Sequence, residues 1–539
     1  MAETDAKSGY CSETKIFHSL RKPLDLPPED IPLTVSSYAL SLQPNNPIVN
    51  PTAMIDCATK RSISYSEFIR QVDSLSFHLH SVVGIKKGDV AFLLCSNSVK
   101  VPIIYFSLMS LGVVLSPSNP MSTEAEILRQ LNLCNPVVAF AVSSASAKLP
   151  NLKFGTIVVD SPDFDSVLAT EAGEIDRVEV SQSAVAAIMY SSGTTGRVKG
   201  VMVTHRNMIA NTASFYQHRS ERRSSAPAVA LGTVPYFHIF GFFAMLRAVA
   251  VSDCVVVMER FDLRSMMRAV DEFKVTHLTV VPPVVVAMVK GDAAAGCDLS
   301  SLETLGVGAA PLGKDVVAAF KTKFPHVVLG QGYGLTESTG PVTRAVGPEE
   351  GLYWGSAGRL VGSCEVKIID IESGVALGPN QPGELWIKGP ILMKGYLGDA
   401  EATAATLTPD GWLKTGDVCY VDEEGYFYVV DRLKELIKYK GYQVAPAELE
   451  QLLQSHPEIS DAAVIPYPDE VAGEIPMAFV VRQPHSSINE AHVMEFVATQ
   501  VSPYKKVRKV AFVNSIPKSP AGKILRKTLR ESIASHSKL

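Results

Sequence analysis

The sequence has few features that would tie it to disulfides, to a bound structural metal or to export. Its eight cysteines never form a C-x-x-C pair, the spacing with which thiolates hold zinc or form redox-active disulfides. We therefore expect reduced thiols and no metal-ligand cluster. The first residues mix charges and lack the apolar stretch of a secretory signal, so we expect an intracellular protein.

The sequence also lacks a strong net charge and a long uninterrupted apolar span. The formal net charge is −5 over 539 residues, which argues against a nucleic-acid-binding protein. The stretch from Ser224 to Leu246 has no charged residue, but Pro227 and Pro235 interrupt any continuous helix. We expect it to form a buried strand followed by the wall of a pocket, and we expect no transmembrane segment.

The chain ends in S-K-L, the tripeptide that the peroxisomal import receptor reads at a free C-terminus. The alternative is a basic tail that ends this way by chance. We expect a peroxisomal protein with the import receptor as a partner, and otherwise a monomer.

Apolar runs alternate with helix-like segments along most of the chain. The runs V-A-F-L-L-C from Val90, S-D-C-V-V-V-M from Ser252 and L-T-V-V-P-P from Leu278 are typical of strands covered on both faces. Between them lie amphipathic segments, so we expect layered sheets and helices, an α/β fold. After the run that begins at Val185, the order expected is strand, glycine-rich loop and helix, the helix starting near Thr204.

The pattern changes near residue 431. Two β-like runs flank a charged D-R-L-K-E, and a helix is expected from Pro446 with Leu449, Leu452 and Leu453 on one face. This indicates a small α+β domain, with a boundary at residues 431–433. We therefore expect an N-terminal domain of residues 1–431 and a mobile C-terminal domain of residues 432–539. Residues 500–539 are strongly basic, which fits either a solvated face or an anionic ligand.

The most informative segment is Y-S-S-G-T-T-G-R-V-K-G-V at residues 190–201. Consecutive small residues let backbone N–H groups converge on phosphate oxygens, hydroxyls add donors, and Lys199 adds charge. The segment is not a Walker loop, because Lys199 follows Gly196 by three residues instead of one. A polyphosphate site of another class is expected.

This segment resembles the S-S-G-T-T-G-x-P-K-G-V signature of the adenylate-forming superfamily, which includes acyl-CoA synthetases, peptide-synthetase adenylation domains and beetle luciferases. Further blocks resemble the family in the same order. They are P-Y-F-H-I-F-G from Pro235, G-A-A-P-L-G-K from Gly308, Q-G-Y-G-L-T-E-S from Gln331, G-W-L-K-T-G-D from Gly411, D-R-L-K-E-L-I-K-Y-K-G-Y from Asp431 and P-K-S-P-A-G-K from Pro517. Within the superfamily the chain resembles the plant 4-coumarate:CoA ligase-like group and, given S-K-L, its peroxisomal members.

The resemblance implies an ATP-dependent carboxylic acid:CoA ligase. ATP would convert the acid to an acyl-AMP, and the CoA thiol would then displace AMP, with Mg²⁺ as cofactor. The acid would be an aromatic propenoate, a fatty acid or a jasmonate-precursor type.

The resemblance also assigns residues to ATP and the metal. The phosphate loop would comprise Ser191, Ser192, Gly193, Thr194, Thr195 and Lys199. Tyr333 would stack on adenine, Thr336 would bind phosphate and take part in catalysis, and Glu337 would bind Mg²⁺, a hard cation suited to carboxylate oxygen. Further nucleotide contacts would come from Ala309, Gln331, Gly332, Asp417, Arg432, Lys434, Lys438 and Lys523. Asp417 and Arg432 are assigned to the ribose.

For the acid and for CoA, the resemblance indicates two further sets. Tyr236, His238, Gly306, Gly308 and Gly332 would line the acyl site, where His238 is also a catalytic candidate, although a lone histidine among aromatics is more often a core residue. Arg260, Lys440 and Gly441 would contact CoA. Lys523 matches the catalytic lysine that bridges carboxylate and α-phosphate as charge develops in the transition state.

Three departures from the family pattern concern Val198, Trp386 and one extra residue between Thr336 and Pro341. Val198 replaces a proline that stiffens the loop but gives phosphate no donor, so we expect a small effect. The other two lead us to expect 4-coumarate to be a poor substrate. Three alternatives stay open: a luciferase-like oxygenase, a carrier-loading adenylation domain, and a non-catalytic nucleotide-binding relative.

Overall fold

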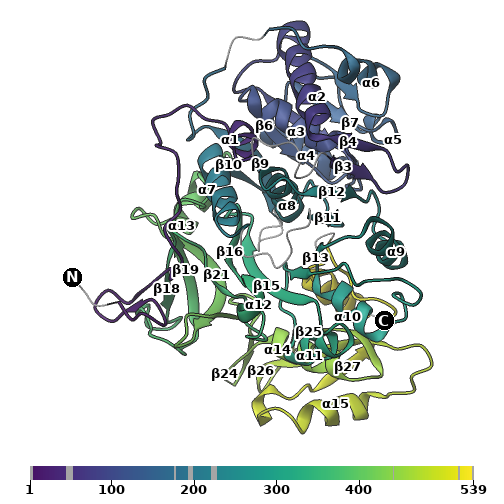
Figure 1. The fold of residues 1–539 in the computed structure, drawn as a ribbon. Coiled ribbons are helices and arrows are strands. Elements are labelled where there is room, and N and C mark those ends of the chain that lie inside the picture. The colour runs from purple at the N-terminus through teal and green to yellow at the C-terminus, as the bar shows by residue number, and fades with distance from the viewer. Residues whose placement is uncertain are drawn as a thin grey trace.

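The computed structural model describes residues 4–43, 52–174, 178–191, 198–219, 228–440, 442–519 and 522–536. Across these ranges the strands form four sheets. The sheets and their helices build a large N-terminal α/β part, and a smaller α+β part follows at the C-terminus (Figure 1). The fold class expected from the sequence is confirmed.

The first two sheets are mainly parallel, as the apolar runs predict, with antiparallel strands at their edges. The seven-stranded sheet runs in the order β20 (Gly395–Tyr396), β10 (Lys199–Thr204), β9 (Val185–Ser191), β6 (Val114–Pro117), β5 (Val90–Leu94), β7 (Val138–Ala141) and β8 (Thr156–Val158). The nine-stranded sheet runs β17 (Arg359–Leu360), β16 (Gly340–Arg344), β15 (Val328–Leu335), β14 (Thr304–Val307), β13 (His277–Val280), β11 (Val229–Gly232), β12 (Cys254–Val257), β3 (Thr52–Asp56) and β4 (Ser62–Ser64).

The chain leaves the third sheet and enters the fourth just after residue 431, where the sequence pattern changes. The six-stranded sheet runs β1 (Tyr10–Cys11), β2 (Ile16–His18), β18 (Glu365–Ile369), β19 (Gly383–Lys388), β21 (Leu413–Val421) and β22 (Phe427–Arg432). The last sheet runs β24 (Tyr442–Val444), β23 (Ile437–Tyr439), β26 (Gly473–Arg482) and β25 (Ile459–Asp469), and β27 (Lys509–Phe512) also pairs with β26. The chain therefore passes from one sheet to the other between Arg432 and Ile437.

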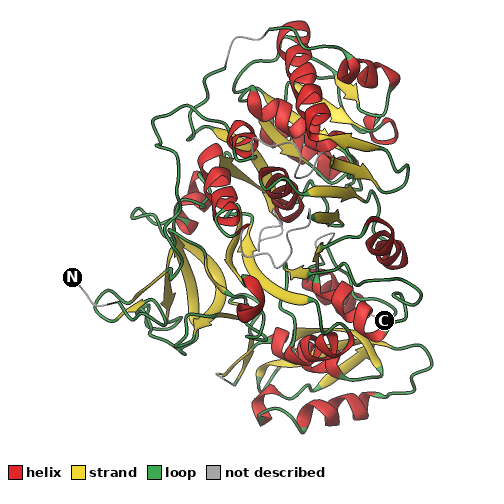
Figure 2. Cartoon of the chain, in the orientation of Figure 1, coloured by secondary structure: helices red, strands yellow, loops and turns green. Residues whose placement is uncertain are grey.

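Helices cover the faces of these sheets (Figure 2). In the N-terminal part they are α1 (Val35–Ser41), α2 (Tyr65–Phe77), α3 (Lys100–Ser110), α4 (Glu124–Cys134), α5 (Ser143–Ser146), α6 (Pro162–Ala169), α7 (His205–Tyr216), α8 (Ile239–Ala250), α9 (Leu263–Phe273), α10 (Pro282–Lys290), α11 (Lys314–Lys323), α12 (Gly347–Glu350) and α13 (Ala400–Thr406). The C-terminal part has α14 (Pro446–Ser455), α15 (Glu490–Ala498) and α16 (Arg526–His536). In the described ranges no helix is long and apolar enough to cross a membrane.

Several local predictions are confirmed. The uncharged stretch supplies strand β11 and helix α8, whose N-cap is His238. Helix α14 begins at Pro446, and Leu449 and Leu453 on its inner face are fully buried. All eight cysteines are free thiols.

The expected order of strand, loop and helix after Val185 is wrong in one respect. Strand β10 intervenes between the loop and helix α7 and pairs antiparallel with β9, Lys199 lying opposite Ser191. The β-branched segment K-G-V-M-V-T suits a strand, and as the second strand of a hairpin it brings Lys199 back beside the start of the phosphate loop. Helix α7 then begins after Thr204, which caps it by accepting a hydrogen bond from the N–H of Asn207.

Candidate active site

One cavity of about 1280 Å³ lies where the nine-stranded sheet, the β9–β10 hairpin and the C-terminal part meet. Most of the residues singled out in the sequence line it, although they come from distant parts of the chain. They are Ser191, Lys199, His238, Gly306, Gly308, Ala309, Gln331, Gly332, Tyr333, Thr336, Glu337, Arg432, Lys434 and Lys523. The fold thus brings the separate sequence blocks to a single site.

The other candidates fall into two groups. Ser192, Gly193, Thr194, Thr195 and Gly441 lie outside the described residues, as does the terminal S-K-L. Tyr236, Arg260, Asp417, Lys438 and Lys440 are described but are not among the residues that line the cavity. Arg260, Lys438 and Lys440 are exposed elsewhere on the surface.

Tyr236 belongs to the hydrophobic core, which corrects the expectation that it lines the acyl site. Its side chain is 2% exposed. Two hydrogen bonds fix its backbone. The hydroxyl of Tyr105 donates to its carbonyl oxygen at 3.2 Å, and its N–H donates to Oδ1 of Asn97 at 2.8 Å. The cavity wall is formed instead by the neighbours Phe237, His238 and Phe240.

Glu337 connects strand β9, which leads into the phosphate loop, with strand β20, which pairs with β10. Its Oε1 accepts hydrogen bonds from the hydroxyl of Ser191 at 3.1 Å and from that of Tyr396 at 3.0 Å. The ammonium group of Lys199 lies 4.2 Å from the centre of the Tyr396 ring, a cation–π contact. A carboxylate, an ammonium group and two hydroxyls are therefore gathered at the mouth of the loop, a set suited to a metal-bound polyphosphate.

Asp417 lies behind the cavity wall and holds two residues that line it. It is 4% exposed, and its Oδ2 accepts a hydrogen bond of 2.7 Å from the hydroxyl of Tyr333. Its Oδ1 lies 3.3 Å from Nε of Arg432, the residue directly opposite on the paired strands β21 and β22. Burial raises the pKa of the Tyr333 hydroxyl, and the Asp417 charge adds to this effect. The tyrosine therefore stays protonated and serves as a donor.

Lys523 lines the cavity from the C-terminal part on a loop that is anchored at both ends. Before it, Nζ of Lys518 lies 2.6 Å from Asp461; after it, the guanidinium group of Arg526 binds both oxygens of Glu450 at 2.8 Å. Burial, together with the nearby charge of Arg432, lowers the pKa of Lys523 to about 8. At neutral pH the lysine is mostly protonated, so its positive charge can bind an anionic ligand in the cavity.

His238 is held as a neutral imidazole at the start of helix α8. Its Nδ1 accepts a hydrogen bond of 3.3 Å from the N–H of Phe240, so the ring proton belongs on Nε2. Burial lowers the pKa of His238 to about 4. The side chain is thus a hydrogen-bond donor toward the cavity over the whole physiological pH range.

The G-A-A-P segment places backbone close to the cavity. Ala309 has a φ of +72°, a left-handed conformation that a non-glycine residue adopts at a cost of about 1–3 kcal/mol. Oε1 of Gln331 accepts a hydrogen bond of 3.0 Å from the N–H of Leu312, which ties this segment to the middle of strand β15. Strain of this kind is typical of segments shaped for a ligand.

Sequence reasoning missed part of the lining. Four lining residues belong to none of the family blocks quoted from the sequence: Phe243, Arg247, Arg344 and Tyr396. Glycines at alternate positions of V-L-G-Q-G-Y-G-L were a signal that one face of this strand is left open. Trp386, which we connected with acid choice, is not a lining residue; it lies on β19, where its ring N–H donates to Glu384.

The fold and the site define the adenylate-forming class of enzymes. MatB from Rhodopseudomonas palustris with bound ATP has a similar fold, with a TM-score of 0.84 at 24% sequence identity over 93% of this chain and 99% of that one. The o-succinylbenzoate CoA synthetase MenE from Bacillus subtilis, in complex with its acyl-adenylate intermediate, has a TM-score of 0.78 at 27% identity over 92% and 97% of the two chains.

The chain belongs to the AMP-binding enzyme family: residues 43–397 match that family, and residues 448–523 match its C-terminal domain. It is 50% identical to 4-coumarate–CoA ligase-like 6 of Oryza sativa subsp. japonica, over 99% of this chain and 94% of that protein. It is 45% identical to peroxisomal OPC-8:0-CoA ligase 1 of Arabidopsis thaliana over the full length of both. The protein is accordingly an acid–thiol ligase of the 4-coumarate–CoA ligase-like group.

Proposed function

We propose that the protein joins a carboxylic acid to CoA in two half-reactions, through an acyl-AMP intermediate. A carboxylate is a poor electrophile, so one of its oxygens must first become part of a leaving group. In the first half-reaction the carboxylate attacks the α-phosphorus of ATP and pyrophosphate leaves. In the second, the CoA sulfur attacks the acyl carbon, the thiol gives up its proton, and AMP leaves. The observation that carries this proposal is that Lys523 and Glu337 line the same cavity as Gly306, Gly308 and Gly332.

In this proposal ATP lies across the mouth of the cavity. Ser191 and Lys199 bind the β- and γ-phosphates together with the loop between them, and Thr336 binds the phosphate chain. Tyr333 and Arg432, both held by Asp417, contact adenine and ribose. Lys434, which also lines the cavity, adds a positive charge near the nucleotide.

Mg²⁺ fits this donor set as a partner of ATP. Glu337 offers a carboxylate, and in the described residues no group of three or more acidic, histidine or cysteine side chains could hold a metal by itself. Mg²⁺ is usually held by one or two carboxylates together with substrate phosphates. When bound, the ion would supply positive charge to the β- and γ-phosphates.

Lys523 and His238 act on the reacting atoms in the first half-reaction. Lys523 brings the carboxylate and the α-phosphate together and stabilises the charge that builds between them. The Nε2–H of His238 donates to a carboxylate oxygen and so orients the acid. Gly306, Gly308 and Gly332 leave room for the acyl group, and Ala309, Gln331 and Gly332 present backbone to the acyl-adenylate.

The second half-reaction uses another orientation of the C-terminal domain. Here Lys523 lines the cavity while Lys438 and Lys440 are exposed away from it. We propose that residues 432–539 rotate about residues 431–433 and bring Lys438, Lys440 and Gly441 to the cavity, where they line the path of the thiol. Arg260 would bind the nucleotide part of CoA.

For the acid, the relatives suggest more than one class. One relative is named for 4-coumarate and another for OPC-8:0, which leaves aromatic propenoates, fatty acids and jasmonate precursors as candidates. We favour an elongated acid over 4-coumarate. The peroxisomal name of one relative and the S-K-L end support a peroxisomal location reached through the import receptor, and we propose a monomer.

A panel of acids tests the proposed function. Purified protein with ATP, Mg²⁺ and CoA should form a thioester and release pyrophosphate in equal amounts with at least one acid. Omission of CoA should leave acid-dependent pyrophosphate release of about one equivalent. Absence of both products with every acid class would reject the proposal. Light from luciferin, ATP and oxygen would favour the luciferase-like alternative.

A further inference from the structure

The end of strand β16 and the turn after it form one wall of the cavity. Residues 344–348 line the cavity one after another. They lie against strand β15, where Gly332 is directly opposite Arg344. A Cβ on Gly332 would be 3.5 Å from the Cβ of Arg344, and a Cβ on Gly330 would be 3.5 Å from that of Ala345. A methyl group on either glycine would thus touch the 344–348 segment, so the position of this segment determines how much room the cavity has beside the glycines.

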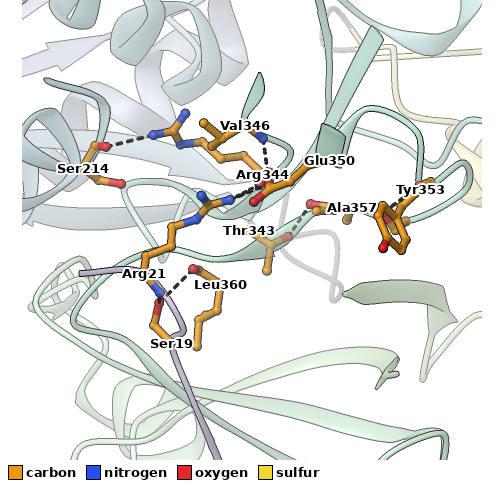
Figure 3. Close-up of polar contacts among 12 residues, drawn as sticks. Ser19, Arg21, Ser214, Thr343, Arg344, Val346, Glu350, Tyr353, Ala357 and Leu360 are labelled. Atoms are coloured by element: carbon orange, nitrogen blue, oxygen red, sulfur yellow. Dashed lines mark hydrogen bonds and ion pairs between the residues drawn. The ribbon is translucent and has the colours of Figure 1, made fainter. Parts of the chain in front are cut away.

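One arginine outside the cavity connects the two ends of this turn. Nη2 of Arg21 donates to the carbonyl oxygen of Arg344 at 2.9 Å and to Oε2 of Glu350 at 2.7 Å (Figure 3). The same carboxylate oxygen accepts a hydrogen bond of 2.7 Å from the N–H of Val346. The side chains of Arg21 and Glu350 are 8% and 13% exposed, and neither residue lines the cavity. A guanidinium group and a carboxylate therefore hold the 344–348 segment without reaching the space where a substrate would lie.

The N-terminal chain that carries Arg21 is itself fixed to the strands on both sides of this turn. The N–H of Arg21 donates to Oγ of Ser19 at 3.1 Å, and that hydroxyl donates to the carbonyl oxygen of Leu360 at 3.0 Å (Figure 3). The N–H of Ser19 donates to the carbonyl oxygen of Cys364 at 3.2 Å. Residues 345–358 join β16 to β17, so the N-terminal chain bridges the start and the end of this connection.

The side chain of Arg344 has a separate anchor on helix α7. It donates to the carbonyl oxygen of Ser214 at 2.8 Å, and its guanidinium carbon lies 3.9 Å from the centre of the Phe215 ring (Figure 3). This anchor remains when Arg21 is replaced. Loss of Arg21 should therefore loosen the 344–348 segment without unfolding the chain.

We propose that Arg21 is a positioning residue for the acid: it holds the 344–348 segment at the position that fits the acyl group of the preferred substrate. Without Arg21 the segment would occupy several positions, and only the molecules with the segment in place would bind the acid well. The apparent affinity for the acid falls in proportion to that fraction, whereas the reacting atoms are unaffected once the acid is bound. This inference rests on the proposed function, in which Gly332 makes room for the acyl group.

Steady-state kinetics with a fixed set of acids tests the inference. The probes are 4-coumarate, OPC-8:0 and straight-chain acids from hexanoate to palmitate, each with ATP, Mg²⁺ and CoA. In Arg21→Met the KM for the best acid should rise about tenfold, the size of one lost hydrogen bond to a charged group. The kcat and the KM for ATP should change by less than about twofold. The preference for the best acid over the next best should fall, because a loosened wall fits neither acid closely.

Further variants separate positioning from simple stabilisation. Arg21→Lys keeps the charge but loses the planar fork, so it should raise the KM for the acid less than Arg21→Met does. Glu350→Gln keeps the shape but loses the charge and should also raise this KM. The double variant should be no worse than the more damaging single one, because both residues act through one contact. Lys22→Met, at the exposed neighbour of Arg21, is the matched control and should keep the wild-type KM.

A fall in kcat with an unchanged KM and an unchanged preference among acids would show that Arg21 only stabilises the fold, and would overturn the inference. Equal rises in KM for the acid and for ATP would overturn it as well, since the effect would not be confined to the acid. If Arg21→Met does not fold, Arg21→Lys and Glu350→Gln decide by the same readouts. Failure of every acid to form a thioester with the wild type would instead reject the proposed function, and the inference with it.

Discussion

The ammonium group of Lys290, at the end of helix α10, donates a hydrogen bond of 2.6 Å to the main-chain oxygen of Ile459 in strand β25. It also donates to the carbonyl oxygens of Gln454 and His456 at 2.7 and 3.4 Å. These carbonyls belong to the end of helix α14 and the turn after it, where a helix leaves carbonyl groups without partners and favours a positive charge. Lys290, which belongs to the N-terminal part, therefore contacts the C-terminal part. It does so in the orientation of the C-terminal part that places Lys523 at the cavity.

We expect Lys290→Ala to weaken this orientation without touching the reacting atoms. Acid-dependent pyrophosphate release should slow by about tenfold, the size of one lost charged hydrogen bond. Thioester formation from preformed acyl-AMP should be unchanged or faster. The matched control is Lys323→Ala, since Lys323 donates in the same way to carbonyls of Met288, Val289 and Gly291 within the N-terminal part. A change in the control as selective as that in Lys290→Ala would contradict the interpretation.

The pH profile of the first half-reaction should report Lys523. Its pKa is lowered to about 8, so the charged form that the chemistry needs is present below that pH and is lost as the pH rises through it. We expect kcat/KM for pyrophosphate release to fall above about pH 8, because this parameter reports the free enzyme. In Lys523→Arg, whose side chain stays charged, the fall should disappear although the rate is lower. A falling limb that survives this substitution would assign it to another group.

The buried pair of Glu450 and Arg526 should stabilise the C-terminal part. Their side chains are 8% and 10% exposed, and Glu450 also accepts a hydrogen bond of 2.8 Å from the N–H of Val464. Glu450→Ala leaves a buried guanidinium group unpaired and should cost about 3–5 kcal/mol of unfolding free energy. Thermal denaturation of the full chain measures this effect.

A matched control uses the exposed pair of Lys527 and Glu531, whose side chains are 76% and 66% exposed at a distance of 3.9 Å. Glu531→Ala should leave the melting temperature within error, as surface pairs contribute little. Equal effects of the two substitutions would show that the buried pair has no special role. Because Arg526 ends the loop that carries Lys523, Glu450→Ala should also slow pyrophosphate release in the fraction that stays folded.

Much of the fold followed from the sequence because local patterns determine local elements. Apolar runs marked β5, β12 and β13, and the proline–leucine pattern marked α14, each within a few residues. Strand β10 was missed because K-G-V-M-V-T was interpreted only as the end of the phosphate-binding motif, and its β-branched residues were not taken to indicate a strand. The pairing of the N-terminal strand β2 with β18, which lie side by side in Figure 1, depends on contacts across more than three hundred residues and has no local signal.

In the candidate site too, some residues could be predicted from local sequence motifs and others depend on the folded structure. Residues in short motifs, such as Glu337 and Lys523, could be named in advance because the chemistry of phosphate and metal needs particular side chains. Arg344 and Arg247 could not, because an arginine in a strand or on a helix is ordinary until the fold places it beside Phe215 in the cavity wall. Tyr236 was assigned to the acyl site by its neighbours in sequence, but packing directed its side chain into the core.

The central claim is that the two half-reactions use different orientations of the C-terminal domain. Lys523 lines the cavity here, whereas Lys438 and Lys440 face solvent, so loss of Lys523 should affect one half-reaction only. The most direct measurement is the rate of each half-reaction in Lys523→Ala and in Gly441→Trp. Lys523→Ala should slow pyrophosphate release by about 10²- to 10³-fold and spare thioester formation from preformed acyl-AMP, and Gly441→Trp should do the reverse. Equal losses in both half-reactions for both variants would contradict the rotating-domain account.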